Sequence, residues 1–315
     1  MSARVLTVTL NPAIDQTVRL TTLEPGHVHR AGRSREDAGG KGINVAACLA
    51  DWGIPTTALG VIGVDNEAVF RGLFELRGIA DACLRVPGQT RTNVKLVERD
   101  GRTTDINLPG LCLDEGVLDA VAQRLATLLR PQMPVVLSGS LPAGLPPTAW
   151  ALLQAQLQAA GARVLLDSSG PALVAALEGD TVPFAVKPNR HELEAWTGRT
   201  LADRDAALDA GRALLARGVS LVAVSMGSDG ALFLDHSGAL LARPPRLAEG
   251  STVGAGDAMV AGIAAALLEP SFDLVGCARL ATAFSMSRLH SGDARRLDPA
   301  QVRAWAGEVQ IERVA

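Results

Sequence analysis

The residues with the clearest capacity for chemistry lie in one short stretch, residues 251–260, which reads STVGAGDAMV. Gly254 and Gly256 allow the backbone to turn sharply and a ligand to come close to it. The apolar, small residues 258–268 predict a helix beginning beside Asp257, and the first amides of a helix carry partial positive charge without intrahelical partners. Such a helix end binds anions, phosphate above all. Asp257 is therefore either a base beside a phosphate site or an ordinary helix cap, where Asp is also favoured.

A second group of candidates lies near the N-terminus. Asn11 and Asp15 directly follow an apolar segment, residues 5–10, that predicts a strand. A carboxylate at a strand end can accept hydrogen bonds from two neighbouring hydroxyls of a sugar. The alternative is that Asp15 satisfies amides of its own turn, which is a common role of Asp.

The glycine-rich segment 39–44 opens a predicted helix over residues 43–52. It is not a Walker A loop, because the spaced first glycine and the Ser or Thr after the lysine are missing. Gly39 and Gly40 still permit close approach of a ligand, Lys41 supplies a charge for a phosphate, and Asn44 can bond a hydroxyl. The alternative is a flexible loop with a solvated lysine.

Two polar residues follow in the middle of the chain. Arg91, within residues 90–95, offers a planar fork for a phosphate. Arg and Lys at alternate positions are also typical of a solvated strand. Ser138 ends a predicted strand at the edge of the sheet where α/β proteins bind their ligands.

Lys187 ends another predicted strand, and a helix is expected to begin directly after it. Asn189 and Glu192 are three residues apart, hence on one face of this helix. They are suited either to orienting Mg²⁺ through water or to forming a capping box.

Residues 225–231 follow a further strand, and the amides around Ser225, Gly227 and Gly230 could cradle the phosphates of a nucleotide. The alternative is a plain hairpin turn. No G-x-G-x-x-G sequence occurs at residues 254–260, because Val260 stands where its third glycine would be. This counts against a dinucleotide-binding oxidoreductase.

An α/β fold is needed to bring these segments together. Strands are predicted at 5–10, 57–62, 135–138, 163–167, 184–187 and 221–225, and helices at 43–52, 66–77, 114–129, 147–160, 189–197, 202–217, 257–268 and 274–289. This alternation predicts a mostly parallel central sheet with helices on both faces, and ligands at the carboxyl ends of its strands.

Two segments interrupt the alternation, at about 14–37 and 90–108. Both have strand-like patterns without an adjacent helix, and Asp100-Gly101 is a hairpin signal between residues 93–99 and 102–107. We expect them to form a small β lid over the strand ends. No linker or internal repeat divides the chain, which predicts a single domain over residues 1–315.

Composition excludes several classes of function. The chain has 315 residues, 48% of them hydrophobic, and a net charge of −3, so it can bury a large core but has no basic surface for nucleic acid. No uncharged apolar run approaches the ~20 residues of a membrane helix. We also expect no signal peptide, because residues 1–4 run directly into the first predicted strand. The widely spaced cysteines, Cys48, Cys83, Cys112 and Cys277, suggest reduced, buried thiols. A cytoplasmic protein is expected.

In this order, at successive strand ends, the motifs resemble those of the ribokinase-like (PfkB) family of sugar kinases. The most specific are Gly39-Gly40-Lys41-Gly42-x-Asn44 and Gly254-Ala255-Gly256-Asp257. The similarity covers nearly the whole chain and is greatest to the bacterial enzymes that phosphorylate fructose 1-phosphate at its 6-hydroxyl. Relatives that act on tagatose 6-phosphate or fructose 6-phosphate share many of the motifs, and a non-catalytic sugar-phosphate binding protein is a more distant alternative.

The resemblance implies a three-layer α/β/α sandwich with a β lid often used for dimerisation, and ATP and Mg²⁺ as cofactors. It implies that Asp257 is the catalytic base and that the amides of Gly254, Ala255 and Gly256 form the anion hole. Sugar-phosphate binding is implied for Asn11, Asp15, Gly39, Gly40, Lys41, Asn44, Arg91, Asn93 and Ser138. Nucleotide binding is implied for Lys187, Asn189, Ser225, Gly227, Gly230, Gly254 and Gly256, and magnesium binding through water for Asn189 and Glu192.

Two finer expectations follow. The positive helix end should stabilise the carboxylate of Asp257, making it an ionised but intrinsically weak base. His27 and His29 occupy a region where relatives that bind a 6-phosphate can use Lys or Arg, which favours a 1-phosphate substrate.

Overall fold

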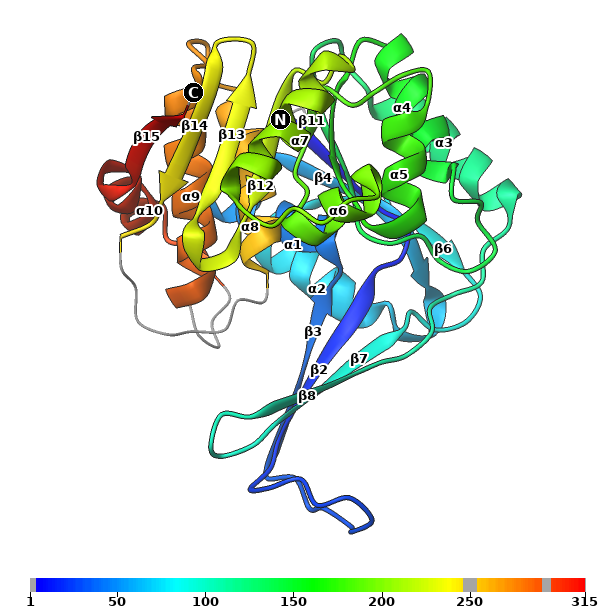
Figure 1. Cartoon of the computed structure of the whole chain (residues 1–315). Helices are drawn as coiled ribbons and strands as arrows, with labels where there is room; N and C mark the ends of the chain where they lie inside the picture. The colour runs from blue at the N-terminus through cyan, green and yellow to red at the C-terminus, as the bar shows by residue number, and fades with distance from the viewer. Residues whose placement is uncertain (1–3, 246–253, 291–295, 315) are drawn as a thin grey trace.

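The computed structural model describes residues 4–245, 254–290 and 296–314. Its main sheet has eleven strands in the order β15-β14-β13-β12-β11-β10-β9-β1-β4-β5, with β6 also paired to β4 (Figure 1). The strands are β1 (Val5–Thr9), β4 (Thr56–Gly63), β5 (Ala80–Asp81), β6 (Leu84–Val86), β9 (Pro134–Ser138), β10 (Arg163–Asp167), β11 (Ala185–Val186), β12 (Leu221–Ser225), β13 (Ala231–Asp235), β14 (Gly238–Arg243) and β15 (Gln310–Val314). From β12 to β5 in this order, each strand is parallel to its neighbour. Their carboxyl ends therefore share one edge of the sheet.

Helices cover both faces of this sheet, as the alternating pattern predicted. One layer contains α3 (Glu115–Leu128), α4 (Ala149–Ala159), α5 (Gly170–Glu178), α6 (Arg190–Thr197) and α7 (Arg204–Ala216); the other contains α1 (Lys41–Asp51), α2 (Ala68–Arg77), α8 (Ala255–Ala266), α9 (Leu274–His290) and α10 (Pro299–Glu308). The central strand β1 shows why the predicted strands are apolar along their whole length. Its residues Leu6 and Val8 pack into the core under the layer that contains α3–α7, and Val5 packs into the core on the opposite face of the sheet. A strand buried on both faces must be apolar throughout.

Small residues allow α8 and α9 to pack closely. A Cβ on Gly262 of α8 would lie 2.6 Å from the Cα of Ala281 in α9, so the two backbones nearly touch. Every residue of α8 from Asp257 to Ala266 is buried. The close packing holds the amino end of α8, and with it Asp257, in a fixed place beneath the carboxyl edge of the sheet.

The three-layer fold is confirmed, and the sheet also has an antiparallel extension that we did not predict. β13, β14 and β15 continue it beyond β12 in antiparallel pairs. The helices α5 and α10 were also missed. Both are short and carry a proline in the first turn, where its missing N–H costs no hydrogen bond.

A second sheet, the lid, leaves the carboxyl edge and projects from the body (Figure 1). Its order is β3-β2-β7-β8, from β2 (Ala13–Arg19), β3 (Arg33–Gly39), β7 (Thr92–Val97) and β8 (Thr103–Asn107). The expected hairpin around Asp100-Gly101 is present between β7 and β8. The first lid segment extends one residue before and two residues beyond the predicted bounds, 14–37, because β2 begins at Ala13 and β3 ends at Gly39.

The expectation for the cysteines is only partly correct. Cys48, Cys83 and Cys277 are buried free thiols, and burial raises the pKa of Cys48 and of Cys277 to about 12. Cys112 is also free but exposed, because its segment crosses the surface between β8 and α3. Over the part of the chain that the structure describes, we found no helix with the length and apolar character needed to cross a membrane.

Candidate active site

Asp257 lies in the first turn of α8, and the residue is only 8% exposed. The helix begins at Ala255, two residues before the predicted start, after Gly254 in the left-handed conformation (φ 80°). The carboxylate does not cap this helix; it accepts a 2.8 Å hydrogen bond from Nδ2 of Asn44 in α1. The helix-cap interpretation is therefore wrong. Residues 251–253 of the motif lie outside the described residues.

The expected direction of the Asp257 pKa shift is also wrong. Burial raises this pKa to about 6, and the nearby carboxylate of Asp167 acts in the same direction. The hydrogen bond from Asn44 and the charges of Lys41 and Lys187 only partly offset the rise. Desolvation outweighs the helix end here because the side chain is almost completely removed from water. Asp257 is still mostly ionised at neutral pH, and it is a stronger base than an exposed Asp.

Asp167 is a site residue that sequence reasoning missed. It ends β10 and is fully buried, with Oδ1 3.2 Å from Nζ of Lys41 and 3.4 Å from Nζ of Lys187. Ser138, at the end of β9, donates a 3.4 Å hydrogen bond to its other oxygen. Burial alone would raise the pKa of Asp167, but the two lysines outweigh burial and hold it below its usual range. A carboxylate at the end of a predicted apolar strand was the available signal.

Two cations flank the turn before Asp257. A Cβ on Gly256 would lie 3.6 Å from Nζ of Lys187, and one on Gly254 would lie 3.2 Å from Nε of Arg288 in α9. The glycines thus let two positive side chains approach a turn whose amides also attract anions. Arg288 was not predicted, because its helix showed no motif.

The root of the lid brings a second polar group together. Nδ2 of Asn93 donates a 3.2 Å hydrogen bond to Asp15, and Nη1 of Arg91 donates a 3.4 Å bond to Asn93. Arg91 also donates to the carbonyl oxygen of Asn11 at 3.3 Å. Gly39 faces this group: a Cβ there would lie 2.7 Å from a carboxylate oxygen of Asp15.

Asn189 and Glu192 form the capping box that was one of their two interpretations. Oδ1 of Asn189 accepts a 2.9 Å bond from the amide of Glu192, whose Oε2 accepts a 2.8 Å bond from the amide of Asn189. The other oxygen, Oε1, lies 4.0 Å from Nζ of Lys41. The box therefore leaves one carboxylate oxygen of Glu192 near Lys41.

The segment around Gly227 and Gly230 is a hairpin turn between β12 and β13, as the plainer interpretation predicted. Gly230 (φ 94°) allows a close approach, since a Cβ there would lie 2.2 Å from the carbonyl oxygen of Ala242. Ser225, the last residue of β12, forms a parallel bridge with Asn189. The turn and the start of α6 are thus neighbours at the same edge.

Comparison with known proteins shows the family of this chain. Residues 8–300 match the pfkB family of carbohydrate kinases. The chain belongs to this family. It is 64% identical to the 1-phosphofructokinase of Xanthomonas campestris pv. campestris, over 100% of both chains. It is 47% identical to the 1-phosphofructokinase of Rhodobacter capsulatus, over 99% of this chain and 98% of that one. The structure of phosphofructokinase-2 from Escherichia coli in complex with potassium superposes with a TM-score of 0.91 and 29% identity, covering 97% and 99% of the two chains.

This carbohydrate kinase thus gathers two groups of side chains at one edge of its sheet. One contains a buried carboxylate of raised pKa, an amide turn and the cations Lys41, Lys187 and Arg288. The other contains hydrogen-bonding groups suited to a sugar. Within the described ranges, no three His, Cys, Asp or Glu side chains are grouped in a way that could hold a metal ion.

Proposed function

We propose that this kinase transfers the terminal phosphoryl group of ATP to the 6-hydroxyl of fructose 1-phosphate, giving fructose 1,6-bisphosphate and ADP. The observation that carries the proposal is the buried Asp257, held by Asn44 beside an amide turn flanked by cations. The names and identities of the two relatives support the choice of sugar. We further propose that residues 1–315 act as one kinase domain.

Asp257 accepts the proton of the attacking hydroxyl. Its pKa of about 6 suits this role, because the carboxylate is ionised at neutral pH and binds a proton more readily than that of an exposed Asp. The amides of Gly254, Ala255 and Gly256 stabilise the transferring phosphoryl group, with Lys187 beside them. Positioning and charge stabilisation supply most of the acceleration, because the transition state of phosphoryl transfer is loose.

The sugar phosphate lies between the lid root and the base. Asp15, Gly40 and Asn44 hold its hydroxyls, assisted by Asn11, Gly39, Asn93 and Ser138. Lys41 and Arg91 bind its phosphate. Lys41 keeps its positive charge in this site: burial lowers its pKa, but the carboxylates of Asp167, Glu192 and Asp257 together outweigh burial and raise it.

The nucleotide lies along the turn at Ser225, Gly227 and Gly230, near Lys187 and Asn189. Mg²⁺, held through water by Asn189 and Glu192, would neutralise charge on the phosphates. The donor set fits, since a carboxylate oxygen of Glu192 is left over by the capping box.

Substrate choice is tested by comparing kcat/KM for fructose 1-phosphate, fructose 6-phosphate and tagatose 6-phosphate with MgATP. We expect fructose 1-phosphate to be preferred. A preference for either 6-phosphate would replace the proposed substrate and leave the kinase assignment in place. The histidines give no support to the 1-phosphate, because His27 and His29 are exposed in the loop between β2 and β3 and contact Glu24.

The base is tested by Asp257→Asn. We expect kcat to fall by about 10²- to 10⁴-fold, the usual contribution of a general base, while both substrates still bind. A non-catalytic binding protein would show no turnover in the wild type. Near-normal kcat in the variant would exclude Asp257 as the base.

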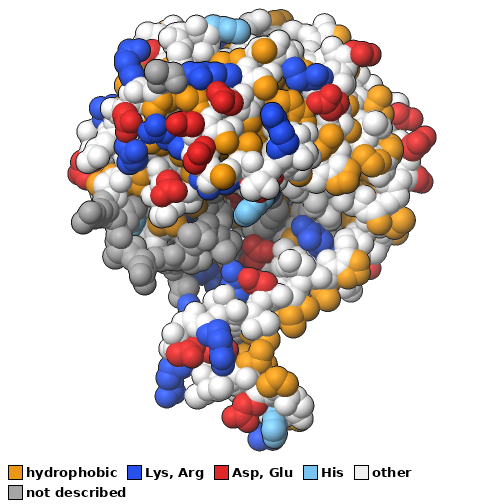
Figure 2. Space-filling view, viewed as in Figure 1, with side chains coloured by type: hydrophobic (Ala, Val, Ile, Leu, Met, Phe, Trp, Pro, Cys, Tyr) orange, Lys and Arg blue, Asp and Glu red, His pale blue; other side chains and the backbone are white. Residues whose placement is uncertain are grey.

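We also propose a homodimer formed through the lid, in a cytoplasmic enzyme. The register places Val94 and Ile106 on one face of the lid, where Ile106 is 47% exposed. Figure 2 shows hydrophobic side chains along one side of the lid that continue onto the body. Ile106→Glu should convert a dimer to a monomer in light scattering, and a monomeric wild type would contradict the proposal. Buried, unpaired thiols fit a reducing compartment.

A further inference from the structure

The lid strand β7 leaves the body immediately after a well-anchored residue, Thr90. Thr90 is 2% exposed, and the next residue is Arg91, the proposed ligand of the sugar's phosphate. We propose that Asn66 and Thr90 form a clamp that positions Arg91 for this phosphate, so that both are positioning residues for sugar-phosphate binding. The inference rests on the proposed function, because it requires that Arg91 binds the substrate.

The side-chain amide of Asn66 pairs with the backbone of Thr90 as a neighbouring strand would. Nδ2 of Asn66 donates a 2.8 Å hydrogen bond to the carbonyl oxygen of Thr90, and the amide of Thr90 donates a 2.9 Å bond to Oδ1. Only an amide side chain offers a donor and an acceptor in this geometry. Because both bonds end on one residue, they fix the orientation of its peptide planes.

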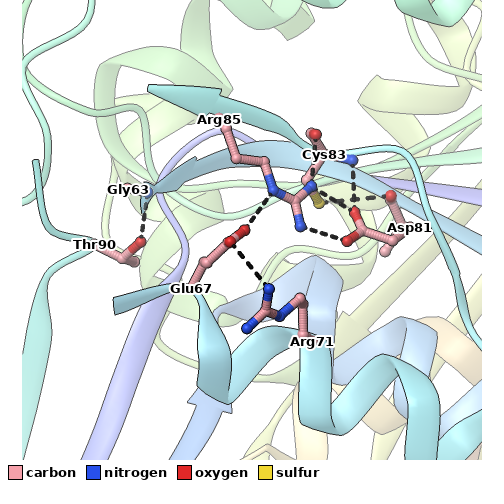
Figure 3. Close-up of polar contacts among 8 residues, drawn as sticks. Gly63, Glu67, Arg71, Asp81, Cys83, Arg85 and Thr90 are labelled. Carbon is pink, nitrogen blue, oxygen red and sulfur yellow. Dashed lines mark hydrogen bonds and ion pairs between the residues drawn. The ribbon is translucent and has the colours of Figure 1, made fainter. Parts of the chain in front are cut away.

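The hydroxyl of Thr90 forms the second half of the clamp. Its Oγ1 accepts a 2.9 Å hydrogen bond from the amide of Gly63, the last residue of β4 (Figure 3). The contact is tight: a Cβ on Gly63 would lie 2.4 Å from the carbonyl oxygen of Gly88 and 2.6 Å from the amide nitrogen of Thr90. The segment before β7 is thus pressed against the end of a core strand.

The clamp is itself tied to the body through charged groups. Asn66 ends the 3-10 helix η1 (Val64–Asn66), and Glu67 follows it directly. Glu67 accepts a 2.8 Å hydrogen bond from Nε of Arg85 in β6, whose other nitrogens bind both oxygens of Asp81 (Figure 3). The sheet edge therefore holds η1, and η1 holds Thr90.

Beyond the clamp, the backbone carries its orientation directly to Arg91. The carbonyl oxygen of Arg91 accepts a 2.8 Å bond from the amide of Ile14 in β2, and its guanidinium donates to the carbonyls of Asn11 and Pro12, both at 3.3 Å. A rotation at Thr90 would move the guanidinium relative to Asp15 and Asn93. The distance from this guanidinium to a bound phosphate would change with it, whereas the residues proposed to bind the nucleotide would keep their positions.

The test uses Thr90→Val, which keeps the shape of the side chain and removes the hydroxyl, and Asn66→Ala. We expect KM for fructose 1-phosphate to rise about three- to tenfold, the effect of losing one or two hydrogen bonds, with kcat and KM for MgATP changed less than about twofold. Thr90→Ser, which keeps the hydroxyl, should restore KM. Equal changes in all three constants, or an unchanged KM for the sugar, would overturn the proposal.

Thr7→Val in β1 is the matched control. Thr7 is equally buried, and its hydroxyl has no hydrogen-bond partner among the described residues. It should leave every kinetic constant unchanged, so a KM effect at Thr90 cannot come from a buried Thr→Val change in itself. Thermal melts of all variants, with Asn66→Asp as a second change if Asn66→Ala fails to fold, separate positioning from loss of structure.

A double variant separates this proposal from the proposed function. If the clamp acts through Arg91, then Thr90→Val raises KM for fructose 1-phosphate when it is the only change, but causes no further rise when Arg91→Ala is already present. Additive effects would overturn the clamp. If the wild type prefers another of the three sugar phosphates, the proposed substrate is wrong, and the same comparison is made with the preferred sugar.

Discussion

The buried carboxylate of Asp257 should lower the stability of the folded protein, and removing its charge should raise that stability. Asp257 has a folded-state pKa of about 6, raised mainly by burial. In the unfolded chain its pKa is about 4. Above pH 6 the folded protein therefore holds a buried charge that the unfolded chain exposes to water. Asp257→Asn keeps the shape of the side chain and an acceptor for Asn44, and it removes this charge.

The difference between the two pKa values sets the magnitude. About two pKa units at about 1.4 kcal/mol each give about 3 kcal/mol of stabilisation for Asp257→Asn at about pH 8. For a chain of this length that corresponds to a rise in Tm of about 4 °C. Since the folded pKa is raised, the wild type gains stability as the pH falls from about 6 to about 4. The advantage of the variant is therefore full above pH 6, shrinks between about 6 and 4, and disappears below.

Calorimetric melts of the wild type and Asp257→Asn at a series of pH values measure this difference, in the absence of nucleotide and sugar. A matched surface change, Asp209→Asn on α7, controls for the loss of one negative charge and should leave Tm nearly unchanged. A Tm for Asp257→Asn at pH 8 that is equal to or below that of the wild type would refute the reasoning. A gain that stays constant down to pH 4 would show that the charge of Asp257 is not its source.

Three further results are expected. The pH profile of kcat/KM should fall tenfold per unit below about pH 6, as Asp257 gains a proton; a profile flat to pH 5 would contradict this. Asp167→Asn should lower the Tm, because about 3–5 kcal/mol is lost when a buried charge loses its partner. It should also move the acid limb of the kcat/KM profile to lower pH, since Asp167 raises the pKa of Asp257. An unshifted limb would argue against coupling between the two carboxylates. Gly262→Ala should cost about 1–3 kcal/mol in denaturant unfolding through a clash with Ala281, and an unchanged midpoint would show that α8 and α9 can separate.

Much of the fold follows from local patterns, because strands buried on both faces and helices with one apolar face differ in sequence. The antiparallel strands β13–β15 were harder to predict. The turn at Gly227 was one of two interpretations of its segment, but the pairing of β14 with the C-terminal strand β15 joins distant parts of the chain and has no local pattern.

Candidate site residues were easiest to select from the sequence where glycines stand beside a charged residue, as at Gly254–Asp257. Asp167 was missed because its importance comes from Lys41 and Lys187, which are distant in sequence and meet it only in the fold. The pKa of Asp257 was misjudged for a related reason. The helix end is visible in the sequence, whereas the burial that outweighs it depends on how α1, α8 and β10 pack together.

The hydrogen bond between Asn44 and Asp257 joins residues 213 positions apart, which has a consequence for the protein during its synthesis. A nascent chain of 250 residues already contains Asp15, Lys41, Asn44 and Arg91, but it has neither the proposed base, Asp257, nor the glycine turn that precedes it. Such a chain also lacks α8 and α9, whose residues form much of the core on one face of the main sheet. Under the proposed mechanism, catalytic competence therefore depends on α8 packing against α1, which can happen only after residues 255–266 have been synthesised.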